Sequence, residues 1–288
     1  PLRFYTAADK TGGEYTTGVT TSGTAGSSGA TVTITIAASA PTLYYQCSSH
    51  AGMGGQINTN STLGSSNFDG TIQSTCKVNA SAGFSIVTWT IPSNAVYTIG
   101  HGLGVAPKAI FMKARNQTTN WDVFHTSIGN TKRIKLNSTD TPEDHTGVWN
   151  DTDPTSSVFT STGSWLNGSG TNVVAYCFSE VASFSKFGSY VGNGSSDNTF
   201  VFTSFKPAWV MAKEVTGYGG NWFILDNKRS PFNVSNDILD ANLSSAERNN
   251  DEFDFLSNGF KVRLAYGSSQ SFIYLAFAES PFKNARAR

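Results

Sequence analysis

The segment Pro107-Lys108-Ala109-Ile110-Phe111-Met112-Lys113 decides the fold, because it recurs as Pro207-Ala208-Trp209-Val210-Met211-Ala212-Lys213. In each copy a proline precedes a mostly apolar run, which is typical of a strand buried on both faces. The shift from position 107 to position 207 is too long for a solenoid repeat. We therefore expect two copies of one β-module.

Further segments repeat in the same order along the chain, at similar offsets. The matched pairs are Asn120-Trp121-Asp122-Val123-Phe124 with Asn221-Trp222-Phe223-Ile224-Leu225, Thr162-Gly163-Ser164-Trp165 with Asn258-Gly259-Phe260-Lys261, and Cys177-Phe178-Ser179-Glu180 with Ala276-Phe277-Ala278-Glu279. The order and spacing predict one module at 83–182 and a second at 183–288.

The composition favours short strands and excludes several classes of function. Aromatic residues make up 12% of the 288 residues and charged residues 14%, with a formal net charge of zero. There is no basic field for nucleic acid or for an anionic membrane surface. No apolar run reaches the roughly 18 residues of a membrane span. The 3 cysteines argue against a disulfide scaffold. We predict an all-β protein that binds no nucleic acid and does not insert into a membrane.

The first 60 residues predict a small β-domain. Residues 31–36 alternate Thr with apolar residues, as a half-buried strand does, and residues 43–47 predict a second strand. Residues 61–82 are polar and lack periodicity, so we interpret them as a linker.

Long polar loops are expected within each module, at 137–157 and 226–252. The second contains residues 238–247, where one short helix is expected. Long loops on a β-scaffold are where binding usually resides. Trp149 lies in the first loop and is our candidate for an exposed contact to a sugar or protein. Asp151 and Asp153 could hold a hard cation or simply cap polar turns.

One turn carries the ligand set of a copper site. Cys47, His50 and Met53 supply a thiolate, an imidazole and a thioether, as in a blue-copper centre, which also needs a second His. None of the 4 histidines precedes Cys47. The alternative is a turn with Cys47 buried and His50 at the surface.

No residue pattern predicts catalysis. There is no Gly-x-Ser-x-Gly elbow to present a nucleophile, and a glycosidase pair could be chosen only arbitrarily from 20 acids. We expect a protein that is not an enzyme and needs no cofactor unless copper is bound.

Residues 1–58 resemble the C-terminal part of a cupredoxin-like domain found in structural proteins of marine phages. The residues that carry the resemblance are Pro1-Leu2-Arg3-Phe4, Glu14-Tyr15-Thr16-Thr17-Gly18-Val19 and Tyr44–Gly55. It implies a partial Greek-key domain, with a first His ligand just before Pro1.

Residues 83–288 resemble a repeat domain of unknown function in tail-fibre and related virion proteins of marine bacteriophages. The motifs include 101–108 (His-Gly-Leu-Gly-Val-Ala-Pro-Lys), Trp149-Asn150-Asp151, 154–159, 175–180, 184–190 and 254–261. This resemblance implies β-sandwich-like modules in a virion appendage and brings no catalytic residues.

The two resemblances predict a phage virion protein, a tail-fibre or capsid-fibre component that presents loops to the host surface. Its partners would be other virion proteins, a host glycan or protein, and further copies of itself, a trimer by analogy with fibres. Its location would be the extracellular particle. Three alternatives remain: a decoration protein without a receptor role, a surface filament or adhesin of a marine microbe, and a copper-binding cupredoxin module.

Overall fold

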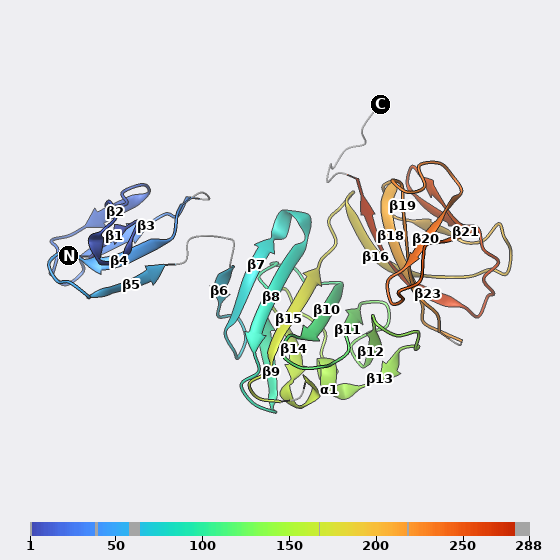
Figure 1. Cartoon of the computed structure of the whole chain (residues 1–288), viewed down its shortest axis with the longest axis horizontal. Coiled ribbons are helices and arrows are strands. Elements are labelled where there is room, and N and C mark those ends of the chain that lie inside the picture. Colours follow the sequence, from blue (N-terminus) through green and yellow to red (C-terminus); the bar gives the residue numbers. More distant parts are fainter. Residues whose placement is uncertain (1, 38–39, 58–63, 167, 218, 280–288) are drawn as a thin grey trace. The chain divides into compact units, whose positions relative to one another are not determined.

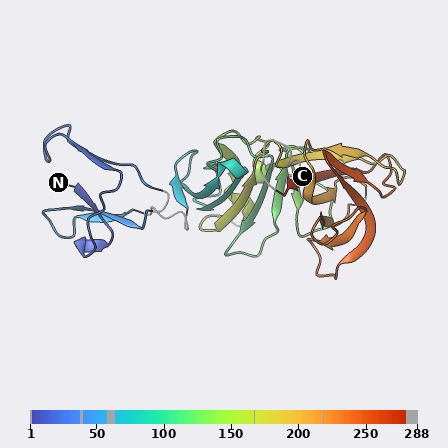
Figure 2. The ribbon, with the colours of Figure 1, turned by 90° about the horizontal axis from the view of Figure 1, so that it is seen from above.

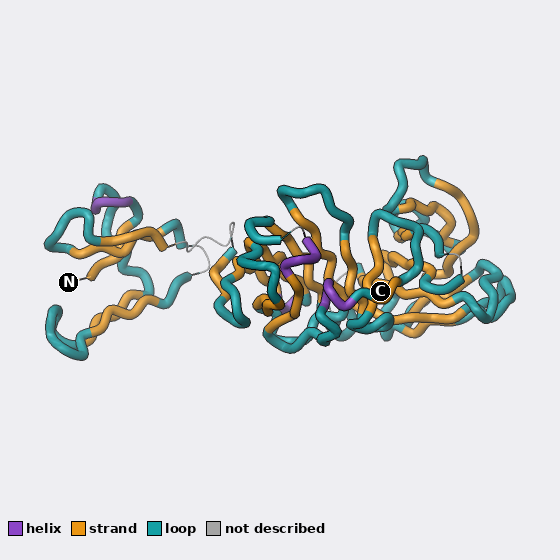
Figure 3. Tube along the Cα trace, turned by 90° about the horizontal axis from the view of Figure 1, so that it is seen from below, coloured by secondary structure: helices purple, strands orange, loops and turns teal. Residues whose placement is uncertain are grey.

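The computed structural model describes residues 2–37, 40–57, 64–166, 168–217 and 219–279. It is 46% strand and 5% helix, which confirms the all-β prediction (Figures 1 and 3). The chain forms two compact units, Pro1–Ser66 and Asn67–Arg288. Each unit is described by itself.

Unit 1 contains a small antiparallel sheet and a separate hairpin. The sheet has the order β1-β4-β5, from strands Leu2–Tyr5, Leu43–Cys47 and Gly54–Ile57. Strands β2 (Val19–Ser22) and β3 (Thr31–Ile34) form the hairpin, and η1 (Ala8–Lys10) is a short 3-10 turn. Both expected strands are present; the cupredoxin-like assignment stays a prediction.

Unit 2 begins with a first module built on an eight-stranded sheet of order β13-β12-β11-β10-β15-β8-β7-β6. The strands, in that order, are Glu143–Asp144, Lys132–Lys135, Asp122–His125, Ala109–Ala114, Asn172–Phe178, Phe84–Thr90, Ser74–Asn79 and Ser65–Asn67, the last of which spans the boundary at Ser66. Strands β9 (Val96–Gly100) and β14 (Val158–Thr162) pair separately. The short helical turns are η2 (Ala80–Ala82), α1 (Thr146–Trp149) and η3 (Gly163–Leu166).

The linker prediction for 61–82 is wrong for its described part, because strand β7 lies within it and pairs with β8. The side chains of Ser74 and Cys76 alternate into the interior, and Cys76 belongs to the core of the module. The two interior residues of β7 are a serine and a cysteine, so their alternation lacks the large apolar side chains that mark a strand in the sequence. Residues 61–63 lie outside the described residues.

The second module has an eight-stranded sheet of order β16-β23-β18-β19-β20-β21-β22-β17. Its strands are Ser185–Val191, Ser271–Ala278, Pro207–Glu214, Trp222–Asp226, Ser235–Asp240, Arg248–Leu256, Gly259–Val262 and Phe200–Phe202. Figure 2 shows these strands, coloured yellow to red, forming a strongly curved sheet. The short helix expected at 238–247 is wrong, because Ile238 is fully buried in β20, opposite Arg248 of β21.

The two modules repeat one pairing order. Strand β10 lies between β11 and β15, as β18 lies between β19 and β23. Phe159 pairs with Ile99 on β9, as Phe260 pairs with Val201 on β17. The expected match of 162–165 with 258–261 is therefore displaced, since strand pairing aligns Phe159 with Phe260.

A third apolar cluster joins the modules. Besides the core of each module, Phe111 and Val123 of the first pack with Met211, Trp222 and Leu275 of the second. Apolar runs such as Ala109–Met112 are therefore buried on both faces, as the sequence predicts.

Polar bonds fix the contact between the modules. Trp222 Nε1 donates to the Lys135 carbonyl at 2.9 Å, and Lys213 Nζ donates to the Thr139 carbonyl at 2.8 Å. His125 Nε2 lies 3.2 Å from the Tyr274 carbonyl. Burial lowers the pKa of His125 to about 4, so its ring is neutral at pH 7.

Candidate functional site

A cluster of polar and aromatic side chains gathers at one edge of the first module. It comprises Asp122 on β11, Arg133 on β12, Glu143 on β13, His145 before α1, and Trp165 on η3. We call these five residues the Asp122 cluster. The loop 137–157, the expected binding loop, supplies two of them.

Asp122 lies at the centre of the cluster, with 1% of its surface exposed. One carboxylate oxygen accepts from Arg133 Nη1 at 3.2 Å and the other from Trp165 Nε1 at 2.7 Å. Burial raises the pKa of Asp122, and its bonds to Trp165 and Arg133 oppose that shift. With both oxygens engaged, this carboxylate positions its neighbours and is not free to act as a base.

Arg133 connects the buried carboxylate to the surface. Its guanidinium also pairs with Glu143 and lies 3.7 Å from the centre of the Trp165 ring. The His145 ring meets Trp165 edge-on, with centroids 3.9 Å apart. Because Arg133 stacks on an aromatic ring and forks to two carboxylates, each of its neighbours is held in one orientation.

The exposed rim of the cluster carries alternating charges. Lys135 pairs with Glu143 at 3.1 Å and with Asp140 at 3.5 Å, and Lys132 pairs with Asp144 at 3.6 Å. Burial raises the pKa of Glu143, but Lys135 and Arg133 outweigh it and the net shift is downward. The rim therefore presents ionised donors and acceptors suited to a polar ligand.

The second module fills the matching positions with apolar side chains. Asp122 pairs across the strands with Lys135 as Phe223 pairs with Asp240, so Arg133 corresponds to Ile238. Phe223 and Ile238 both belong to the second core. The buried ion pair is thus a feature of the first module that the shared fold does not require. Aligning the two repeats in the sequence could have revealed this site, because Asp122 stands where the second copy has Phe223.

The prediction that Trp149 is exposed is wrong. Its side chain is 1% exposed, belongs to the core of the first module, and meets the Phe124 ring at 5.7 Å. The sequence places Trp149 in a polar loop, but the residue lies at the end of α1, a helical turn whose buried residues are Val148 and Trp149. Trp149 anchors the loop and is not available to a ligand.

Asp151 and Asp153 are both exposed, as a binding role requires. Asp151 has a φ of 47° and follows Asn150, whose φ is 51°, in a left-handed turn after α1. Among the described residues, no three His, Cys, Asp or Glu side chains are placed to hold a metal ion. A cation ligand set around Asp151 is therefore not assembled there.

Cys47 and His50 lie together in one turn of unit 1. Cys47 Sγ is 3.3 Å from His50 Nδ1, and the Cys47 amide donates to the Met53 carbonyl at 2.8 Å. Hydrogen bonds from the Ser49 amide and from His50 lower the Cys47 pKa to about 7. The Met53 side chain points to solvent and is 60% exposed. The described residues bring one thiolate and one imidazole together, which is short of a blue-copper ligand set, so we derive no copper chemistry from it.

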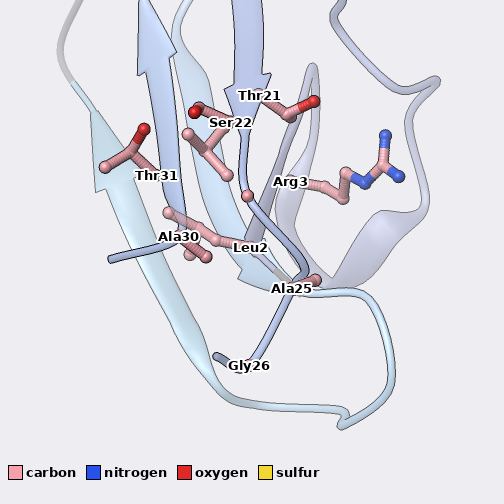
Figure 4. Close-up of a pocket in the computed structure, with 10 residues that line it drawn as sticks. Leu2, Arg3, Thr21, Ser22, Ala25, Gly26, Ala30 and Thr31 are labelled. Atoms are coloured by element: carbon pink, nitrogen blue, oxygen red, sulfur yellow. The ribbon is translucent and has the colours of Figure 1, made fainter. Parts of the chain in front are cut away.

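Two of the shallow pockets among the described residues lie in unit 1. One of about 290 Å³ lies between β1 and the β2–β3 hairpin and is lined by Leu2, Arg3 and the side chains of Thr21, Ser22 and Thr31 (Figure 4). Arg3 pairs with Glu14 at 2.9 Å, and both side chains are largely exposed. The second, of about 210 Å³, lies beside Tyr45 and Gly54. Neither gathers charged groups comparable to the Asp122 cluster.

Comparison with protein families finds a match over most of the chain. A family model described as "Domain of unknown function (DUF7483)" covers residues 57–281, which include both modules. No curated protein and no solved structure matches the chain. Within the part of the chain that the structure describes, no helix is long and apolar enough to cross a membrane.

Proposed function

We propose that this chain, which belongs to the DUF7483 family, is a non-catalytic structural protein of a phage virion appendage. In this proposal the two modules form a rigid support and the rim of the Asp122 cluster contacts the host surface. The resemblance of residues 83–288 to tail-fibre proteins supports the virion assignment.

The observation that carries the binding role is the buried Asp122–Arg133 pair. A buried ion pair stabilises a fold poorly compared with apolar side chains of similar size. The second module builds the same strands with Phe223 and Ile238 in these positions. The ion pair is therefore better explained by what it holds in place, namely Glu143, His145 and Trp165.

A pre-organised polar surface suits a host glycan or a polar protein surface. Side chains fixed before binding lose little conformational entropy on contact, and repetition over many subunits multiplies weak contacts into avidity. The rim offers carboxylates from Glu143 and Asp140 and the ammonium group of Lys135. Such groups bind hydroxyls and charged substituents of sugars.

The first experiment locates the protein. An antibody to residues 83–288 is used for immunogold imaging of a lysate from the source culture. Gold on particle tails or capsid fibres supports the proposal. Gold on cell envelopes or free filaments overturns it in favour of a microbial adhesin.

The second experiment tests the site with matched variants. Glu143→Gln removes a rim charge that pairs with Arg133, and Glu247→Gln removes a similarly exposed charge that pairs with Arg229 in the second module. We expect labelled Glu143→Gln protein to bind host cells more weakly, while Glu247→Gln binds as the unchanged protein does. Equal binding by both variants would remove the Asp122 cluster from the proposal. The protein could also be present on particles that adsorb to host cells equally well without it. That result would favour the decoration role.

A further inference from the structure

Strand β17, at one end of the second sheet, corresponds to β9 of the first module. Val201 pairs with Phe260 as Ile99 pairs with Phe159. The two strands therefore present their outer edges in equivalent places. The hydrogen bonding of those outer edges differs between the modules.

In the first module a segment of the same chain covers the edge of β9. The Thr71 amide donates to the Thr98 carbonyl at 3.2 Å, and the Thr98 amide donates to the Thr71 hydroxyl at 2.9 Å. The Ser74 hydroxyl donates to the Gly100 carbonyl at 2.8 Å. An extended segment thus satisfies the backbone groups that point away from β14.

In the second module, no strand of the described chain pairs with the outer edge of β17. Thr199 and Thr203 bond inward to the β22 side, at Val262 and Asn258. Because inward and outward bonding alternates along an antiparallel strand, the N–H and C=O groups of Phe200 and Phe202 point to the free edge. These are the positions that Thr98 and Gly100 hold in the first module.

The side chains on this edge are apolar and exposed. Phe200 is 41% exposed and Phe202 is 60% exposed, while Val201 between them faces the core. No charged residue occurs between Asp197 and Lys206. An uncharged edge with two exposed aromatic rings lacks the usual protection against pairing with another strand.

The other edge of the same sheet is partly protected. On β16, the Phe187 amide donates to the Glu180 carboxylate at 3.0 Å, and the Val191 carbonyl accepts from the Thr199 hydroxyl at 2.6 Å. Lys186 adds a charge to that strand. The outer edge of β16 is thus partly bonded and carries a charge, whereas the outer edge of β17 has neither feature among the described residues.

The sequence of the open edge reads the same in both directions, Thr199-Phe200-Val201-Phe202-Thr203. We propose that a second copy of this chain docks here, with the two β17 strands antiparallel about a twofold axis at Val201. Phe200 of each copy then lies opposite Phe202 of the partner, and these residues exchange their free backbone hydrogen bonds. Identical surfaces meet, as a twofold contact requires.

The contact is small, so the dimer is weak in isolation. A few strand residues and the paired phenylalanine rings fall below the roughly 1,200 Å² of a standard stable interface. We expect a dissociation constant on the order of 0.1 mM. Such a contact becomes effective when other parts of an assembly hold the copies close together.

Sedimentation velocity of the full chain over a wide range of concentrations tests the proposal. We expect a monomer–dimer equilibrium for the unchanged protein. Phe202→Lys places like charges at the twofold contact and is expected to leave a monomer throughout. Phe232→Lys is the matched control, because Phe232 is 82% exposed and lies outside β17; it should dimerise normally. A monomer at every concentration, a trimer, or equal loss in both variants would overturn the proposal.

Disulfide formation tests the register. In a Cys47→Ser background, Phe200→Cys and Phe202→Cys proteins are oxidised with glutathione, separately and mixed. Directly opposite residues lie about 5.5 Å apart between Cα atoms, within disulfide reach, whereas identical residues of the two copies lie diagonally beyond it. We expect a cross-linked heterodimer in the mixture alone. Cross-linking of either variant by itself to the same extent, or none in the mixture, would overturn the antiparallel pairing about Val201.

Discussion

Asp122 of the first module and Phe223 of the second occupy the same position in equivalent strands. Phe223 packs against Phe253 and Phe272 in an apolar core, while Asp122 receives bonds from Arg133 and Trp165. One backbone therefore supports two different interiors. The comparison offers internal controls for several predictions.

The first module should remain stable with the apolar side chains of the second only when Asp122 and Arg133 are replaced together. Asp122→Phe leaves the buried Arg133 without its central partner and should lower the free energy of unfolding by about 3 kcal/mol. Asp122→Phe with Arg133→Ile should return it to within about 1 kcal/mol of the unchanged protein. Urea unfolding measures both. A double variant as unstable as the single would mean that the ion pair is needed for the fold.

Glu252 should make the second module less stable as the pH rises. Its side chain is fully buried on β21 and accepts from the Tyr266 hydroxyl at 2.7 Å. Burial raises the pKa of Glu252 from 4.5 to about 7. Below the unfolded pKa both states carry the proton and the stability is fully present. Between pH 4.5 and 7 the unfolded state releases it first, so stability falls, by about 3 kcal/mol in total.

Glu252→Gln mimics the protonated carboxyl and should remove this slope. His125 has a lowered pKa and contributes an opposite slope in acid, so the difference between the two proteins is the useful quantity. Thermal unfolding is measured from pH 4 to 8. The stability of the variant relative to the unchanged protein should increase as the pH rises. Parallel curves would refute the assignment.

Replacing Trp149 should affect stability rather than contact with a ligand. Trp149→Ala removes a buried indole from the first core and should lower the free energy of unfolding by about 3–5 kcal/mol. Trp121→Ala removes a half-buried indole and should be milder. Thermal melts compare them. A Trp149→Ala protein of normal stability would contradict the buried position.

Asparagine side chains close the same turn in each module. Asn137 Oδ1 accepts from the Trp121 amide at 2.9 Å, and Asn242 Oδ1 accepts from the Trp222 amide at 2.9 Å. Each asparagine also donates to the side chain before that tryptophan, Asn120 or Asn221. Because the geometry is shared, Asn137→Ala and Asn242→Ala should each lower the free energy of unfolding by about 1–2 kcal/mol. Chemical denaturation measures the free energy of unfolding of both variants. A loss in only one of them would contradict an equal role for the two asparagines.

Cys47 should be the reactive thiol at neutral pH. Its pKa is lowered to about 7 by the Ser49 amide and His50, whereas burial raises the pKa values of Cys76 and Cys177. Brief iodoacetamide treatment should modify Cys47 first, and His50→Ala should slow that reaction. Peptide mass spectrometry identifies the site. Faster labelling of Cys76 in the folded protein would contradict this order.

The sequence predicts the strands well where both faces are apolar. The paired segments at Ala109–Met112 and in β18 show their strand character and their duplication directly. The sequence is misleading where the neighbouring residues are polar, as at Trp149, which lies in a polar segment but packs in the core of the first module. Residues 238–247 have a helix-like composition, but Ile238 enters the second core from a strand.

The site was only partly predictable. The expected loop at 137–157 does supply Glu143 and His145, yet its central partner is Asp122, in a strand that reads as core. Arg133 and Trp165 reach that carboxylate from other elements, and a single sequence does not record such distant pairing. Only comparison with the second copy, which has Phe223 and Ile238 at these positions, shows that a buried ion pair is unusual there.

The apolar cluster of Phe111, Met211 and Trp222 has a consequence for how this protein can change over time. Each module shields a surface of the other that water would otherwise reach, so neither half is a sensible unit to excise, shuffle or express. A substitution in this face of one module therefore has to fit the facing side chains of the other, which limits how far either copy can diverge alone.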